Sequence, residues 1–284
     1  MTPSIHSITL AAVCLACTLP STAQTAAPQG YVQGTATQHT PESLRLAVER
    51  AWVGLPASAT GGAAYQGLLQ NAPATRGKTP VVLFLHGSSG IAPAIREWQK
   101  WLAESLGISS LAADSMQLPD RITYKSPVAA TTYEQVHALR AQELSAMVQA
   151  LPRLPWADAS RFVVAGTSEG AVSVARYETA PGVPMERGRI IYSWSCEDNY
   201  HVQGHRSHLP GGVPVLNVMS STDVFFSSAN PWLGNPRAQG HCAAALQDNK
   251  QSTIVLIPGA PHTLLNLLQA RQATEDFHRA QLQP

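Results

Sequence analysis

The chain has 284 residues, of which 44% are hydrophobic and 13% are charged, so it is long and apolar enough to fill a sizeable core. Its formal net charge of +1 gives no electrostatic basis for binding nucleic acid or an anionic membrane. The length favours one α/β domain over two.

The first residues have the features of a secretory signal peptide. The apolar segment from Ile8 to Leu19 is shorter than the roughly 20 residues that span a bilayer. Ser21 and Ala23 have the spacing that a signal peptidase recognises, which predicts a signal peptide over residues 1–23 and export to a periplasm or out of the cell. Against this interpretation, the segment before Ile8 contains no Lys or Arg. No membrane span is expected after the signal is removed.

Residues 24–40 are rich in small and polar residues, which predicts a flexible lead-in, and a single domain is expected over residues 41–284. Residues 44–55 have the pattern of a short amphipathic helix. Residues 64–70 are compatible with an antiparallel strand that leads into the core.

From residue 79 onward, apolar strands alternate with helices. The continuous apolar run over residues 79–87 is typical of a central strand, and residues 94–107 then place apolar side chains on one face of a helix. Further strands are expected over residues 107–114, 161–166, 187–194, 212–221 and 251–259, and further helices over residues 133–152, 237–248 and 264–281. This alternation predicts a mostly parallel sheet with right-handed crossovers and helices on both faces.

A serine stands where the strand over residues 161–166 turns into helix-like sequence. Gly166, Ser168 and Gly170 match G-x-S-x-G, the nucleophile elbow, in which a strained turn projects the serine hydroxyl at the edge of the sheet. Glycine on both sides lets the strand and the helix approach each other. The alternative, a serine that only caps the helix, does not explain the two glycines.

A serine hydroxyl needs a base to accept its proton and an acid to orient that base. Asp223 follows one predicted strand and His262 follows the next, so the order Ser, Asp, His is that of an α/β-hydrolase. Asp223 could instead be a turn residue, with Glu197 and Asp198 as competing acids. His262 could be an ordinary surface histidine.

Two backbone N–H groups are expected to form an oxyanion hole. One belongs to Glu169, directly after the serine, and the other to Ser88 in the loop that follows the strand ending at His86-Gly87. The alternative for the Ser88 segment is a plain Gly-Ser turn.

Two cysteines remain if the signal peptide is removed. In an exported protein, Cys196 and Cys242 suggest one disulfide, and two separate buried thiols are the alternative.

Five segments, FLHGSSG, AADSMQLPDR, GTSEGA, SSTD and PGAPH, together resemble an exported dienelactone hydrolase-like member of the α/β-hydrolases over roughly residues 65–282. The resemblance implies acyl hydrolysis without a cofactor. The dienelactone hydrolases that name the group use a cysteine nucleophile, whereas this elbow carries Ser168, so the lactone substrate is not implied. In that group an Asp-Ser pair and a later Arg border the mouth of the site. Asp114 and Arg121 therefore either shape the site or form a structural salt bridge.

Aromatic residues near the ends of the later strands either line an apolar acyl pocket or belong to the core: Trp194, Tyr200, Phe225, Phe226 and Trp232. The segment with Cys196, His201, His205 and His208 has some features of a metal site. A polar loop over the site, with Arg206 meeting an anionic substrate, is favoured, so no metal is expected.

The sequence favours a serine hydrolase that cleaves an ester of a small-molecule or polymeric acyl substrate, with Ser168 as nucleophile, His262 as acid and base and Asp223 as its orienting acid. The alternatives are an exported peptidase or amidase, or a polymer-degrading hydrolase, on the same triad. A noncatalytic binding protein of the hydrolase fold is disfavoured, because binding does not require an elbow, an acid and a histidine together.

Overall fold

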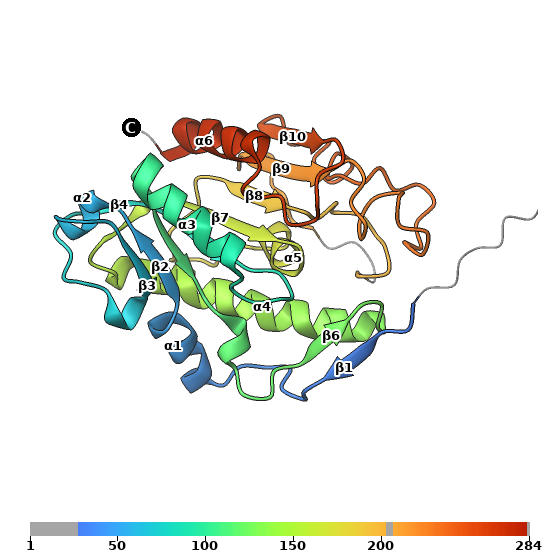
Figure 1. The fold of residues 1–284 in the computed structure, drawn as a ribbon, viewed down its shortest axis with the longest axis horizontal. Coiled ribbons are helices and arrows are strands. Elements are labelled where there is room, and N and C mark those ends of the chain that lie inside the picture. Colours follow the sequence, from blue (N-terminus) through green and yellow to red (C-terminus); the bar gives the residue numbers. More distant parts are fainter. Residues whose placement is uncertain (1–27, 203–206, 283–284) are drawn as a thin grey trace, which may run out of the picture.

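The computed structural model describes residues 28–202 and 207–282, which form a central sheet covered by helices on both faces (Figure 1). The sheet has eight strands in the spatial order β3-β2-β5-β4-β7-β8-β9-β10. Strand β2 pairs antiparallel with β3 and β5, and the other neighbouring strands of this sheet pair parallel. The strands are β2 (Trp52–Leu55), β3 (Tyr65–Leu68), β4 (Thr79–Leu85), β5 (Ser109–Ala112), β7 (Ala157–Thr167), β8 (Arg189–Tyr192), β9 (Val215–Ser220) and β10 (Ser252–Ile257).

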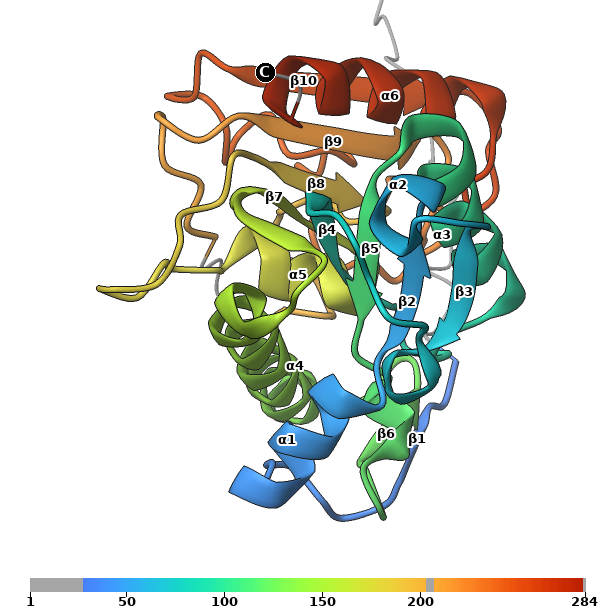
Figure 2. The same cartoon turned by 90° about the vertical axis from the view of Figure 1, so that its left-hand side faces the viewer.

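The helices divide between the two faces of the sheet, as Figure 2 shows. They are α1 (Pro41–Glu49), α2 (Ala57–Thr60), α3 (Pro93–Leu106), α4 (Ala130–Ala150), α5 (Glu169–Ala175) and α6 (Leu268–Leu282), with 3-10 turns over Leu69–Asn71, Ser115–Gln117 and Leu151–Arg153. Buried side chains of α1, α4 and α5 pack in one core, and those of α3 and α6 pack in another.

Strand β4 contributes to both of these cores. Val81, Leu83 and Leu85 pack on the side of α4 and α5. Val82 and Phe84 pack on the side of α3 and α6. Successive side chains of a strand point to opposite faces, so a strand covered on both faces must be apolar throughout.

Three predicted elements differ from the structure. Residues 44–55 were expected to be one helix, but α1 ends at Glu49 and Trp52–Leu55 form β2, which is held between β3 and β5. Tertiary pairing overrides the local helical pattern there. Residues 237–248 contain turns instead of the expected helix. The last helix begins at Leu268 instead of residue 264.

Part of the expected lead-in carries regular structure. Strand β1 (Tyr31–Gln33) pairs with β6 (Thr123–Lys125) in a separate two-stranded sheet. Residues 1–27, which include the predicted signal peptide, lie outside the described residues. Among the residues that the structure does describe, no helix is both long and apolar enough to cross a membrane.

Candidate active site

The turn from β7 into α5 holds Ser168 in a strained backbone conformation. Ser168 has φ 53° and ψ −119°, a region that costs a non-glycine residue roughly 1–3 kcal/mol. A Cβ on Gly170 would lie 2.3 Å from the carbonyl oxygen of Leu85, and a Cβ on Gly166 would lie 2.7 Å from the carbonyl carbon of Gly170. The elbow therefore requires glycine at both positions, for the steric reason that the sequence suggested.

The structure brings Asp223 and His262 together at the carboxyl ends of β9 and β10. Nδ1 of His262 lies 2.7 Å from one carboxylate oxygen of Asp223. The other carboxylate oxygen accepts hydrogen bonds from the backbone N–H groups of Phe225 at 2.9 Å and Phe226 at 3.0 Å. Asp223 is buried, and these three contacts fix its orientation. An ionised Asp223 accepts the proton of Nδ1 and leaves Nε2 of His262 free to act as a base.

The end of β8 connects the elbow to the histidine. The N–H of Ser168 donates to the carbonyl of Tyr192 at 3.0 Å, and the hydroxyl of Ser193 donates to the carbonyl of His262 at 2.5 Å. No hydrogen bond joins the side chains of Ser168 and His262 in the described chain. In structures without substrate this bond is often unformed, and it tightens in the reacting complex.

The loop after β4 lies against Ser168. A Cβ built on Gly87 would be 3.4 Å from Cβ of Ser168, so the predicted oxyanion loop and the elbow are in contact. Ser88 is exposed in this loop. Glu169 is the first residue of α5, where the N–H groups have no partner within the helix.

Arg121 forms a buried salt bridge with Glu169, the residue that follows Ser168. Its guanidinium donates to the carboxylate of Glu169 and to the hydroxyl of Ser115, both at 2.7 Å. The partner of Arg121 is therefore Glu169 and not Asp114. Asp114 is the N-cap of a 3-10 turn and accepts from the N–H of Met116 at 3.1 Å.

Of the aromatic residues, two belong to the core, and Phe225 and Phe226 contact the ring of His262. Trp194 and Phe226 are buried in the core. The ring of Phe225, which is partly exposed, lies 4.7 Å from that of His262 between centroids. Tyr200 and Trp232, also partly exposed, contact each other at 4.4 Å between ring centroids.

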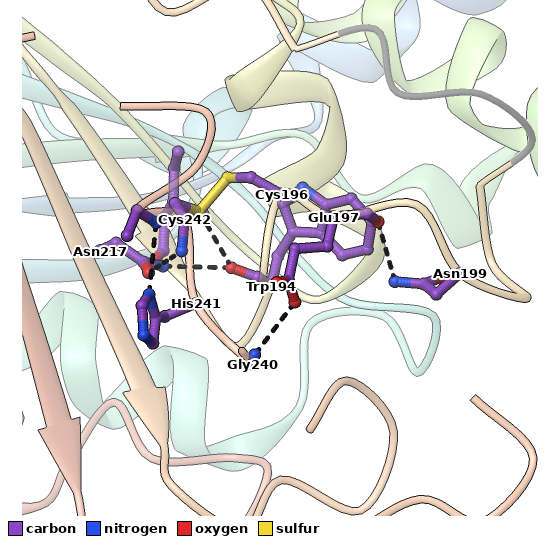
Figure 3. The surroundings of a disulfide bond; sticks show 10 residues. Trp194, Cys196, Glu197, Asn199, Asn217, Gly240, His241 and Cys242 are labelled. Atoms are coloured by element: carbon purple, nitrogen blue, oxygen red, sulfur yellow. Dashed lines mark hydrogen bonds between the residues drawn. A yellow bond between two sulfur atoms is a disulfide. The ribbon is translucent and has the colours of Figure 1, made fainter. Parts of the chain in front are cut away.

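Cys196 and Cys242 are joined by a disulfide, as the sequence suggested (Figure 3). The bond links the loop after β8 to the segment that precedes β10. In the same loop, the carboxylate of Glu197 accepts from the N–H groups of Gln239 at 2.7 Å and Gly240 at 3.0 Å. These contacts hold residues 239–242 in a turn in place of the expected helix. They also occupy Glu197, one of the two competing acids.

The structure also places Asp198, the other competing acid, and part of the segment that has some features of a metal site. Asp198 is exposed, and its carbonyl accepts from Asn235. Cys196 has no free thiol for a metal, and within residues 28–202 and 207–282 no group of three His, Cys, Asp or Glu could hold one. His201 is buried among aromatic rings, and burial lowers its pKa well below the usual value. His205 and Arg206 lie outside the described residues.

Sequence reasoning missed a buried polar cluster beneath the elbow. It consists of His39, His86, Arg121, Arg140, Glu143 and Glu169. The only local signal is the pair Arg140 and Glu143, which stand three residues apart in α4.

No protein-family model matches the sequence, and no curated protein matches it. A putative dienelactone hydrolase from Klebsiella pneumoniae is similar in structure, with 15% identity, a TM-score of 0.51 and coverage of 81% of this chain and 97% of the other. A dienelactone hydrolase-like promiscuous phosphotriesterase from metagenomic libraries has 16% identity and a TM-score of 0.50 over 72% of this chain and 88% of the other. Est1E from Butyrivibrio proteoclasticus, bound to ferulic acid, has 16% identity and a TM-score of 0.50 over 82% and 95%. The chain therefore has the α/β-hydrolase fold, as these structural neighbours do.

Proposed function

We propose that the protein is a serine hydrolase that cleaves carboxylic esters, with Ser168, His262 and Asp223 as its triad. The observation that carries the proposal is the bonded pair of His262 and Asp223, 2.7 Å apart, at the same edge of the sheet as the strained elbow. A structural serine, aspartate and histidine would not require this combination of strain and orientation.

The reaction follows from the roles of these groups. Nε2 of His262 takes the proton of the Ser168 hydroxyl as its oxygen attacks the ester carbonyl carbon. The N–H groups of Glu169 and Ser88 stabilise the negative oxygen of the tetrahedral intermediate. His262 returns the proton to the leaving alcohol, and the acyl group stays on Ser168. A water molecule, deprotonated by His262, then attacks the acyl-enzyme; the bond from the acyl carbon to the Ser168 oxygen breaks, His262 returns the proton to that oxygen, and the acid leaves.

The descriptions of the similar structures favour an ester substrate over an amide. Two are described as dienelactone hydrolase or dienelactone hydrolase-like, and a lactone is a cyclic ester. Their low identity makes this support for the reaction class only.

The experiment that tests the proposal is labelling with a fluorophosphonate, followed by peptide mass spectrometry. We expect the adduct on Ser168, turnover of short-chain p-nitrophenyl esters, and loss of both in Ser168→Ala. Ser173→Ala is the matched control, because Ser173 is a buried serine of the same helix. Substantial activity in purified, folded Ser168→Ala, or an adduct on another residue, would refute the assignment. Faster turnover of matched amides would move the substrate class to amides.

We also propose that the protein is exported. The disulfide between Cys196 and Cys242 supports this, because disulfides persist in oxidising compartments. The exported protein should begin at Gln24, which N-terminal sequencing would test, and a retained residue Met1 would refute it.

A further inference from the structure

The buried polar cluster beneath the elbow connects both proposed donors of the oxyanion hole. Its two arginines and two glutamates balance in charge, and the side chains of all four are at most 3% exposed. Burying an unpaired charge is costly, so each member depends on its partners.

Arg140 of α4 contacts three other members of the cluster, which are His86, Glu143 and Glu169. Its guanidinium donates to Nε2 of His86 at 2.9 Å and to the carbonyl of His86 at 3.1 Å, and it pairs with Glu143 at 3.1 Å. On its other side, Nε lies 3.8 Å from the carboxylate of Glu169. Arg140 thus lies between the end of β4 and the first residue of α5.

The partners of His86 define its tautomer. Nε2 faces two donors, the guanidinium of Arg140 and the N–H of Ser115 at 3.0 Å, so it must carry the lone pair. Burial, followed by the positive charge of Arg140, lowers the pKa of His86 well below its usual value, and the ring is neutral. The single ring proton is therefore on Nδ1, which donates to the carbonyl of Gly87 at 2.6 Å.

This hydrogen bond, together with one that the Gly87 carbonyl accepts from the N–H of Gly90 at 3.2 Å, orients the peptide unit that contains the proposed donor. The carbonyl of Gly87 and the N–H of Ser88 belong to the same planar unit, and the described chain has its single cis bond elsewhere, at Ser126-Pro127. In a trans peptide the C=O and N–H point in opposite directions. With the carbonyl held against the buried His86 ring, the N–H of Ser88 points away from the interior.

The second donor is held through the side chain of its own residue. The carboxylate of Glu169 is fully buried and bonded to Arg121 at 2.7 Å, with Arg140 facing it. The two arginines also offset a negative charge that would otherwise oppose an oxyanion next to it.

We propose that Arg140 is a positioning residue of the active site, which orients the N–H of Ser88 through His86 and supports that of Glu169 through its carboxylate. The inference rests on the proposed function, since it concerns the oxyanion hole of that reaction. It predicts that the arginine acts on the rate of the chemical step and leaves substrate binding nearly unchanged.

The test measures kcat and KM on a p-nitrophenyl ester for Arg140→Lys, which keeps the charge but loses the planar fork of donors. We expect kcat to fall at least about tenfold with KM little changed, because losing an oxyanion donor outright costs about 10²- to 10³-fold. The matched control is Arg189→Lys. Arg189 is also buried, pairs with Glu186 at 2.6 Å and donates to two backbone carbonyls. It is the first residue of β8, so it lies at the amino ends of the parallel strands, away from the carboxyl ends that carry the proposed site. Its variant should keep kcat within about twofold at a comparable loss of stability.

A second pair of variants separates orientation from packing. His86→Leu fills the space without a donor, and kcat should fall about 10²-fold. His86→Asn places an amide N–H near the position of Nδ1, so it can still donate to the carbonyl of Gly87 and should recover most of that loss. Equal losses in both variants would overturn the inference, because packing alone would then explain them.

The outcomes distinguish this inference from the proposed function. If Ser168→Ala keeps wild-type kcat, both fail. If Ser168→Ala is inactive while Arg140→Lys keeps wild-type kcat, or falls no further than Arg189→Lys, the positioning role alone is refuted.

Discussion

Replacing Asp223 by asparagine tests the proposed triad with the smallest change of shape. One carboxylate oxygen accepts from the N–H groups of Phe225 and Phe226, and an asparagine carbonyl can keep both contacts. The amide nitrogen must then face Nδ1 of His262, where the other oxygen now lies at 2.7 Å. Because that nitrogen is a donor, Nδ1 must become an acceptor and the ring proton moves to Nε2. His262 can then no longer accept the proton of Ser168.

The expected effect is large on catalysis and small on stability. A wrong tautomer in a Ser-His-Asp triad lowers kcat by about 10⁴-fold, which corresponds to about 5.4 kcal/mol in the activation free energy. The folded state exchanges hydrogen bonds to a charged acceptor for neutral ones, which lowers the free energy of unfolding by about 1–3 kcal/mol. The two effects are therefore separable.

The assay compares kcat on a p-nitrophenyl ester with the free energy of unfolding in urea. Asp198→Asn is the matched control, since Asp198 is the other acid after a strand and is exposed. We expect it to keep kcat within about twofold. If Asp223→Asn retains more than about a tenth of kcat, Asp223 does not orient the base. A large loss in Asp198→Asn would transfer the role to that residue.

Two further predictions concern the elbow and the buried histidines. Gly170→Ala places a Cβ 2.3 Å from the carbonyl oxygen of Leu85, so the free energy of unfolding in urea should fall by about 1–3 kcal/mol and kcat should fall at least about tenfold. Gly62→Ala, at an open position, is the control and should change neither quantity. An unchanged Gly170→Ala would contradict the steric argument. Burial lowers the pKa of His278 to about 3, and neither ring nitrogen has a hydrogen-bond partner among residues 28–202 and 207–282. The unfolded state, with a histidine pKa of about 6.5, therefore binds one more proton than the folded state between these two values. The contribution of His278 to stability is complete above about pH 6.5 and falls by about 1.4 kcal/mol per pH unit as the pH decreases toward 3. His278→Leu should remove this contribution to the pH dependence of the free energy of unfolding, measured in urea at pH 7 and pH 5, and should retain catalysis. An unchanged pH dependence would show that the histidine is not buried as a neutral group.

The sequence by itself determined those features that depend on neighbours along the chain. The apolar run of β4 and the glycines around Ser168 give local signals, because strand burial and a sharp turn constrain adjacent residues. The order of the strand ends also placed Asp223 and His262 at one edge of the sheet, since parallel strands share their direction. The structure brings those two side chains into contact, as that order suggested.

Only the tertiary structure decided the features that depend on partners distant in sequence. Strand β2 forms because β3 and β5 supply its hydrogen bonds, and residues 237–248 form turns because Glu197 and the disulfide hold their backbone. The buried cluster is the strongest case. Arg140 meets His86 across 54 positions of sequence, and no hydrophobic period or motif encodes such a contact. A buried charge requires a partner, but only the packing of β4, α4 and α5 determines which residue supplies it.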